Sequence, residues 1–318
     1  MEVLTQNTFA LEVLEGLKQS PKTLPSKYFY DSIGDKLFQK IMAMPEYYLT
    51  RTEKEILEKY KQQIIHDFSP NDEPFDLLEL GAGDGLKTKV LLNELLQENI
   101  TFTYKPLDIS LNALTLLKED LQAEMKDLPV DIINGDYFES LKKLKEDHSR
   151  KKLILFLGSN IGNLTIKEAT DFLSQLQSNL NPGDGVLVGF DLKKDPRVIL
   201  PAYNDEAGIT AAFNKNLLSR INKELDADFD LDAFEHHPSY NPETGTAKSY
   251  LVSTKQQSVY LRKLEETISF YPWESIHTEI SQKFDHNTIE RMAERAQLNI
   301  KEVYLDSKQY YANYLFKV

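Results

Sequence analysis

The stretch from Phe75 to Thr88 limits the possible folds most, because it combines a short apolar run with a cluster of glycines. The apolar run carries one acid near its end and leads into Gly81, Gly83 and Gly85, and an amphipathic run follows at once. This order indicates a strand, a tight turn and a helix. At the carboxyl end of a strand in an open α/β sheet, such a turn lets the backbone approach a nucleotide-like ligand, and the helix N-terminus offers N–H groups. Because many structural turns also contain glycines, the turn alone leaves a purely structural role open.

The alternation of apolar and amphipathic runs continues along the chain and predicts a parallel sheet with helices on both faces. The further predicted strands are 102–109, 130–134, 152–157 and 186–190. The alternation stops near residue 192 and resumes with a helix at 287–296, a strand at 300–305 and a terminal strand at 311–318 that we expect to run antiparallel. The residues between form an insertion with a helix at 209–225 and hairpin-like runs at 249–253 and 258–261.

The N-terminal region contains a helical spacing at 9–19 and two segments rich in tyrosine, at 27–38 and 45–53. The sheet itself does not need these segments, and we expect them to pack with the insertion. A structural alternative is that their tyrosines are amphipathic packing residues. Within the second segment, the pattern Thr50-x-x-Glu53 predicts a capping box that opens the helix that follows.

Composition narrows the class of partner. The chain has 318 residues, so one large domain with an insertion or two domains are both expected. The formal net charge of −13 argues against nucleic acid or an anionic membrane as the main partner. Together with the lack of an apparent apolar seam, the same acidity favours a monomer. The absence of cysteine excludes disulfides and thiolate metal sites. No apolar run approaches the roughly 20 residues that span a bilayer and the N-terminus lacks a basic region before an apolar core, so we expect a cytoplasmic protein.

Acidic side chains follow two of the predicted strands: Asp108 ends the second strand and Asp136 follows the third. Two ligands are the main candidates for a sheet with a glycine turn after its first strand: a dinucleotide and S-adenosylmethionine. In either case, an acid at the end of the second strand can hold the ribose hydroxyls. The Gly-x-Gly-x-Gly spacing and the neighbouring Glu79 and Asp84 suit a cationic ligand without a pyrophosphate better. Asp136 is placed to accept from the adenine amino group. The structural alternatives are a helix N-cap neighbour for Asp108 and a turn residue for Asp136.

Two other polar clusters are weak candidates for a metal site. His236 and His237 are adjacent, so on an extended segment they point to opposite faces, and no third ligand lies at metal spacing. Alternating aspartates at 226–232 have the spacing of a calcium loop, but the glycine and the closing glutamate are absent. We therefore predict no metal site.

A methyltransferase needs a shaped pocket more than acid–base machinery, because the sulfonium of its methyl donor is already activated. A pocket for an amine must bind the neutral form, which tyrosine hydroxyls and a polar amide can do. The residues with this chemistry are Tyr30, Tyr47, Asn163 and Tyr203. Glu279 and Ser281 lie two positions apart, so on an extended segment they face the same side.

Five segments carry a family resemblance. They are Lys-Tyr-Phe-Tyr-Asp-Ser-Ile-Gly-Asp-Lys-Leu-Phe at 27–38, Pro-Glu-Tyr-Tyr-Leu-Thr-Arg-Thr-Glu at 45–53, Leu-Glu-Leu-Gly-Ala-Gly-Asp-Gly-Leu-Lys-Thr at 78–88, Gly-Ser-Asn-Ile-Gly-Asn at 158–163 and His-Thr-Glu-Ile-Ser at 277–281. In these segments the chain resembles the histidine-specific, S-adenosylmethionine-dependent N-alpha-methyltransferases of ergothioneine biosynthesis. The resemblance covers nearly the whole chain. The Tyr-Tyr and Gly-Ser-x-Ile-Gly-Asn segments are more specific than the glycine turn.

The resemblance implies an α/β fold. It consists of the Rossmann-like sheet of a class I methyltransferase and a second, substrate-binding domain. The implied core is 62–192 with 283–318, and the implied substrate-binding domain is 1–61 with 193–282. The cofactor implied is S-adenosylmethionine. The positions implied to bind it are Gly81, Gly83, Lys87, Asp108, Asp136 and Tyr137.

The resemblance also implies roles for the polar pocket residues. Tyr47 and Asn163 would position the alpha-amino group of a free amino acid, and both are the implied catalytic residues. Tyr203 would hold the carboxylate, and Tyr30 would line the same pocket. The positions of Glu279 and Ser281 are those that would hydrogen-bond an imidazole. A substrate without a ring N–H would leave Glu279 buried and unpaired. The resemblance therefore favours L-histidine over other amino acids as the substrate.

One segment departs from the family pattern: Lys248, Ser249 and Tyr250 stand where the family has an acid, a methionine and an arginine. Because the methionine shapes the side-chain end of the pocket, Ser249 would enlarge it or make it more polar. A methyltransferase of another amino acid or primary amine is therefore one alternative. The others are a non-catalytic binding protein of the same fold and a nicotinamide-dependent oxidoreductase, which suits the glycine spacing poorly.

Overall fold

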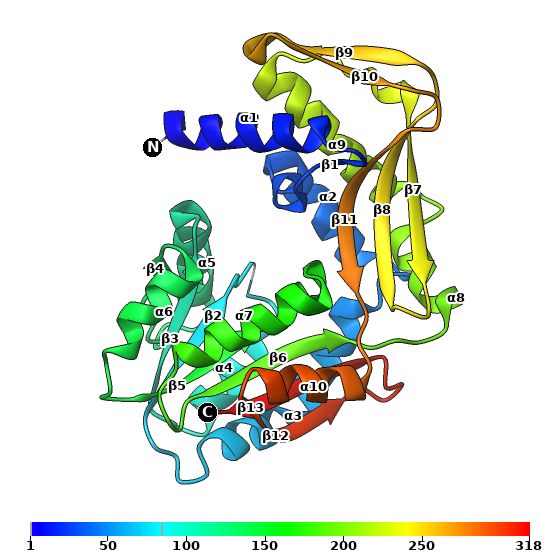
Figure 1. The fold of residues 1–318 in the computed structure, drawn as a ribbon. Helices are drawn as coiled ribbons and strands as arrows, with labels where there is room; N and C mark the ends of the chain where they lie inside the picture. The colour runs from blue at the N-terminus through cyan, green and yellow to red at the C-terminus, as the bar shows by residue number, and fades with distance from the viewer. Residues whose placement is uncertain (1, 84) are drawn as a thin grey trace. The chain divides into compact units, whose positions relative to one another are not determined.

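A computed structural model describes residues 2–83 and 85–318, with side chains from residue 8 onward. The chain forms two compact units (Figure 1). We call Leu49–Lys193 with Gln282–Val318 the sheet unit, and Met1–Tyr48 with Lys194–Ser281 the insertion unit. In the part of the chain that the structure describes, no helix has the length and apolar character needed to cross a membrane.

The sheet unit is built on seven strands in the order β12-β13-β6-β5-β2-β3-β4. Neighbouring strands from β4 to β6 run parallel, whereas β13 runs antiparallel to both β6 and β12. This confirms the predicted parallel sheet and the antiparallel terminal strand. The strands are β2 (Phe75–Leu80), β3 (Phe102–Asp108), β4 (Ile133–Asn134), β5 (Lys151–Phe156), β6 (Gly185–Asp191), β12 (Asn299–Leu305) and β13 (Tyr311–Lys317).

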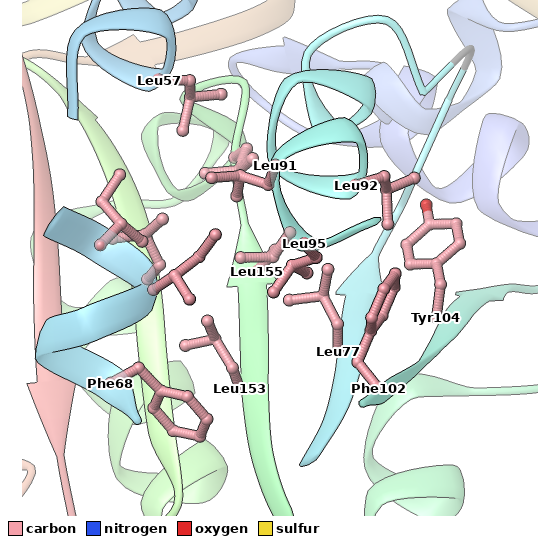
Figure 2. Packing of buried hydrophobic residues seen from close by; sticks show 14 of the residues in the cluster. Leu57, Phe68, Leu77, Leu91, Leu92, Leu95, Phe102, Tyr104, Leu153 and Leu155 are labelled. Carbon is pink, nitrogen blue, oxygen red and sulfur yellow. The ribbon is translucent and has the colours of Figure 1, made fainter. Parts of the chain in front are cut away.

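Helices cover both faces of this sheet, so every residue of β2 is buried. Successive residues of the strand point to opposite faces: Leu77 packs in one core with α3, α4 and α5, and Leu78 packs in a second core with α6, α7 and α10. Figure 2 shows the first core, where Leu77 faces the leucines of α4. Burying one leucine fully contributes about 1.5–3 kcal/mol. The helices are α3 (Leu49–Phe68), α4 (Thr88–Gln97), α5 (Leu111–Glu124), α6 (Tyr137–Lys145), α7 (Ile166–Ser178) and α10 (His286–Arg295), with a short turn η2 (Asn160–Asn163).

Helix starts follow local hydrogen bonding. Ser110 caps α5 and accepts from the Ala113 N–H at 3.2 Å. Thr165 and Glu168 form a capping box at the start of α7. The predicted capping box at Thr50 is wrong: α3 begins at Leu49, so Thr50 lies inside the helix, and the Glu53 carboxylate accepts from residues outside it.

The insertion unit has a sheet of four strands in the order β1-β11-β8-β7 and a separate hairpin of β9 and β10. Its core combines α9 and the helices of the N-terminal region with the inner face of the sheet. The strands are β1 (Lys22–Thr23), β7 (Phe234–Asn241), β8 (Thr246–Ser253), β9 (Gln257–Leu261), β10 (Glu266–Phe270) and β11 (Ser275–Gln282). The helices are α1 (Glu2–Lys18), α2 (Ser32–Ala43), α8 (Pro196–Ile199) and α9 (Ile209–Leu225), with short turns η1 (Ser26–Phe29), η3 (Leu200–Tyr203), η4 (Leu231–Ala233) and η5 (Arg262–Leu264).

The observed division of the chain differs from the predicted one mainly near the N-terminus. We placed the first boundary after residue 61, within a predicted helix, whereas the compact units divide between Tyr48 and Leu49. The reason is that α3 packs its apolar side, including Ile56 and Ile64, in a core of the sheet unit. The later boundaries, after Lys193 and Ser281, lie within one residue of the predicted ones.

Candidate active site

The glycine turn after β2 has a left-handed backbone at each glycine, with φ of 71° at Gly81, 56° at Gly83 and 66° at Gly85. A Cβ on Gly81 would lie 2.7 Å from the Tyr137 hydroxyl, so the turn and the start of α6 approach each other closely. A Cβ on Gly83 would meet nothing within 4 Å. Its backbone is therefore open to a ligand. Asp84 lies outside the described residues.

The predicted acids occupy the ends of neighbouring parallel strands. Asp108 is the last residue of β3 and accepts from the Ser110 N–H at 2.9 Å. Asp136 caps α6, and the two backbone N–H groups that it accepts both donate to Oδ1, so the cap does not use Oδ2. Tyr137 directly follows Asp136, and burial first, then the charge of Asp108, raises the pKa of its hydroxyl to about 12. Asp108, Asp136 and Tyr137 therefore form one cluster.

Glu79 lies in β2 just before the glycine turn and is only 5% exposed. Its carboxylate accepts from the Thr88 hydroxyl at 2.6 Å and from the Tyr104 hydroxyl at 2.5 Å. Burial raises the pKa of Glu79 to about 7, against the opposing effects of these two hydrogen bonds and of the Lys87 charge. The side chain thus belongs to the packed interior rather than to an exposed acidic patch beside the turn.

Lys87 follows the glycine turn and forms an ion pair with a residue that sequence analysis did not place in the site. Its ammonium lies 2.5 Å from Oε2 of Glu53 in α3. The same Oε2 accepts from the Gly158 N–H at 2.8 Å, and Oε1 accepts from the Tyr311 hydroxyl at 3.0 Å. Glu53 therefore joins Lys87 to the segment that leaves β5 and to the start of β13.

Asn163 ends the turn η2, which follows β5, and its side chain is exposed. Gly158 and Ser159 begin this segment with φ of 78° and 58°. A Cβ on Gly162 would lie 3.0 Å from the Gln282 carbonyl oxygen, so the turn also needs a glycine there for close packing. The Gly-Ser-x-Ile-Gly-Asn motif thus presents an amide beyond the carboxyl end of a central strand.

The other predicted substrate residues belong to the insertion unit. The ring of Phe38 lies between two of the predicted tyrosines, with centroids 5.5 Å from Tyr30 and 6.3 Å from Tyr47. Although 45% of the Tyr30 surface is exposed, desolvation raises the pKa of its hydroxyl, and the charge of Glu279 adds to this effect. Tyr30 and Tyr47 thus contact the ring of Phe38, in keeping with the packing role that stands as the structural alternative.

Glu279 and Ser281 both lie on β11, two positions apart. The Ser249 hydroxyl donates to Oε2 of Glu279 in a long hydrogen bond of 3.4 Å. The hydroxyls of Tyr203 and Ser281, both buried, lie 2.8 Å apart. The structure thus pairs the predicted residues as Ser249 with Glu279 and Tyr203 with Ser281. Ser249, which stands where the resemblance implies a methionine, thus makes a polar contact with the glutamate.

The two adjacent histidines lie on β7, where His236 pairs with Leu251 and His237 with Tyr250 of β8. Burial lowers the pKa of His236 to about 4, so this ring is neutral at physiological pH. Among residues 2–83 and 85–318, no group of three or more His, Asp or Glu side chains is arranged to hold a metal ion.

The sequence of the chain matches the profile of the family described as "Histidine-specific methyltransferase, SAM-dependent" over residues 9–318. It is 39% identical to the histidine N-alpha-methyltransferase of Mycolicibacterium smegmatis, over 89% of this chain and 87% of that protein. It is 37% identical to the protein of the same name from Mycobacterium tuberculosis, over 86% and 83% of the two chains. It is also 30% identical to ergothioneine biosynthesis protein 1 of Schizosaccharomyces pombe, over 98% of this chain and 41% of that protein.

The family profile covers all but the first eight residues, including the glycine turn, the Gly158–Asn163 motif and the strand that carries Glu279 and Ser281. The chain therefore belongs to the histidine-specific, S-adenosylmethionine-dependent methyltransferase family.

Proposed function

We propose that the protein transfers methyl groups from S-adenosylmethionine to the alpha-amino group of free L-histidine, up to the trimethylated product. The observation that carries the choice of histidine is Glu279, which lies two residues before Ser281 on β11 and accepts from Ser249. A carboxylate in this position is a strong acceptor for an imidazole N–H. The similarity to two named histidine N-alpha-methyltransferases supports the same substrate.

The residues around the glycine turn fit the cofactor. Gly83 leaves its backbone open, Asp108 ends β3 with a carboxylate for ribose hydroxyls, and Oδ2 of Asp136 is not used by the helix cap. The Lys87 ammonium supplies a partner for the carboxylate of the methionine moiety. We propose the same contacts for the whole predicted set, which is Gly81, Gly83, Lys87, Asp108, Asp136 and Tyr137.

The bound cofactor supplies an electrophilic methyl group on a sulfonium, so the protein has to present a neutral amine in line with it. We propose that the Asn163 amide oxygen and the Tyr47 hydroxyl accept from the amino group and orient its lone pair. Tyr203 holds the substrate carboxylate, and Tyr30 lines the pocket. Repeated transfer requires the amine to lose a proton before each step, and no side chain is assigned as the base.

Replacing Asn163 by Ala tests the role of this amide. We expect turnover to fall by at least about a hundredfold, while the dissociation constant for S-adenosylhomocysteine changes less than about threefold, because the amide orients the amine rather than the cofactor. Asn287→Ala is a matched control, since Asn287 is an exposed asparagine of α10 in the same unit. A wild-type rate for Asn163→Ala would contradict the assignment.

The substrate is tested by incubating the protein with S-adenosylmethionine and the twenty amino acids and following added methyl groups by mass spectrometry. We expect histidine alone to gain mass, in steps up to three methyl groups. Methylation of another amino acid would mean that Ser249 has changed the pocket. Cofactor binding without any methylation would favour a non-catalytic binding protein, and other primary amines would then be tried.

Oligomeric state and cellular location stay predictions from composition. The net charge of −13 favours a monomer, which sedimentation velocity would measure directly. Fractionation of cells that express the protein would test the predicted cytoplasmic location.

A further inference from the structure

Glu53 lies at the junction of three segments of the sheet unit and has no role in the predicted site. Its side chain is 1% exposed, although it is charged. It receives donors from Lys87 after β2, from Gly158 after β5 and from Tyr311 at the start of β13. A Cβ on Gly189 in β6 would lie 2.2 Å from Oε1 of Glu53, so the carboxylate lies directly against a fourth strand.

The position of the Lys87 ammonium is set by these contacts. A Cβ on Gly158 would lie 3.0 Å from the Lys87 nitrogen, so the absence of a side chain at Gly158 makes room for the ammonium. Lys87 itself is 23% exposed, which leaves part of the side chain open to solvent. An ammonium has three N–H donors, and Glu53 takes one of them. Among the described residues, Glu53 is the acceptor recorded for this ammonium, which leaves donors for a second anion.

A buried carboxylate is stable only when its partners compensate the loss of hydration. Glu53 has such partners in an ammonium, a backbone N–H and a hydroxyl. The surrounding charge gives a reason for the arrangement. The charge of Glu53 raises the pKa of Glu79, the other buried carboxyl of this region, and the charge of Lys87 lowers it, so the Lys87 ammonium offsets part of the negative charge here.

We propose that Glu53 is a positioning residue for cofactor binding: it holds the Lys87 ammonium beside the carboxyl ends of β2 and β5, where Lys87 binds the carboxylate of the methionine moiety. This inference rests on the proposed function, in which S-adenosylmethionine is the cofactor. Glu53 itself does not contact the cofactor. It acts by keeping one lysine rotamer in place before binding.

Two opposing effects follow when Glu53 loses its charge. Without its charge, Glu53 no longer repels the negatively charged carboxylate of the cofactor. The Lys87 side chain, however, also loses its partner, so it has to be ordered and desolvated when the cofactor binds. Ordering one long side chain on binding opposes association. Because Lys87 already neutralises Glu53 at 2.5 Å, little repulsion remains to be relieved, and we infer that the ordering cost dominates.

The test compares two ligands that differ in the part Lys87 would bind. S-adenosylhomocysteine carries the amino-acid carboxylate, and 5′-methylthioadenosine lacks it. For Glu53→Gln we expect the dissociation constant for S-adenosylhomocysteine, measured by calorimetry, to rise about five- to tenfold, and that for 5′-methylthioadenosine to change less than twofold. Glu58→Gln is the control, because Glu58 lies on the same helix and its side chain is 56% exposed.

A merely structural role of Glu53 would weaken both ligands alike, and this outcome would overturn the proposal, as would an unchanged or tighter constant for S-adenosylhomocysteine. Lys87→Met should lose affinity for the same ligand, and adding Glu53→Gln to it should cause no further loss. Where Glu53→Gln does not fold, Tyr311→Phe removes a single donor to Glu53, and we expect the same selective but smaller effect. Failure of the wild-type protein to bind either ligand would instead overturn the proposed function.

Discussion

The raised pKa of Glu79 predicts an unusual dependence of stability on pH. An unfolded glutamate loses its proton with a pKa of 4.5, whereas burial holds the folded carboxyl at about 7. Between these values the unfolded chain binds fewer protons than the folded chain at this position. The free energy of unfolding therefore falls as the pH rises through this window, and the loss is complete above pH 7.

The size of the effect follows from the two pKa values. The penalty for this one carboxyl is below about 1 kcal/mol at pH 5 and about 3 kcal/mol at pH 8, a difference of about 2–3 kcal/mol. Glu79→Gln removes the titrating group but keeps one acceptor and adds one donor for the hydroxyls of Thr88 and Tyr104, each of which can either donate or accept. Relative to the parent, the variant should therefore gain about 2–3 kcal/mol between pH 5 and pH 8.

The assay is urea unfolding of both proteins at several pH values, followed by circular dichroism. Tryptophan fluorescence is unsuitable, because the single tryptophan, Trp273, lies in the insertion unit rather than in the unit that contains Glu79. Comparing variant with parent at each pH cancels the other titrating groups, and the exposed Glu119→Gln serves as the charge control. A variant-minus-parent difference that stays constant within about 0.5 kcal/mol from pH 5 to 8 would refute the reasoning.

Two further predictions concern packing and charge in the sheet unit. Gly81→Ala should destabilise the protein by about 1–2 kcal/mol, because a residue with a Cβ is strained at φ of 71° and would contact the Tyr137 hydroxyl. Adding Tyr137→Phe should recover part of this stability, measured by urea unfolding. No recovery would mean that backbone strain alone is responsible. Lys283→Met should lower the free energy of unfolding by about 3–5 kcal/mol, because it leaves Asp191, its fully buried partner at 2.7 Å, without this cation. Adding Asp191→Asn should restore much of the stability. An additive loss of stability on thermal unfolding would argue against a coupled pair.

Local patterns in the sequence were sufficient for most of the sheet unit. The glycine turn, Asp108 and Asp136 were placed correctly, since the alternation of strand and helix determines which residues follow each strand. The α9 helix has the predicted bounds, Ile209–Leu225, because its apolar spacing is regular. The roles of these residues in binding remain proposals, which the ligand and turnover measurements above would test.

Interactions between distant segments were not predictable from such patterns. The partners of Glu53 lie 34, 105 and 258 residues away along the chain, at Lys87, Gly158 and Tyr311, so the local capping pattern gave the wrong role. The predicted hairpin-like runs 249–253 and 258–261 are strands, but they pair with β7 and β10 rather than with each other. The helix α2 was missed within a segment that stood out only for its tyrosines.

The parallel pairing of β1 with β11 affects the order in which the protein can fold during synthesis. Lys22 and Thr23 are synthesised about 250 residues before their partners, Ile276 and His277. At about 5–20 residues per second, the wait lasts roughly 10–50 s. During this time the apolar side chains of the N-terminal region, such as Phe29, lack the partners from α9 and β11 that bury them. This segment is thus made well before the residues that bury it, and it is a segment for which a chaperone would matter during synthesis.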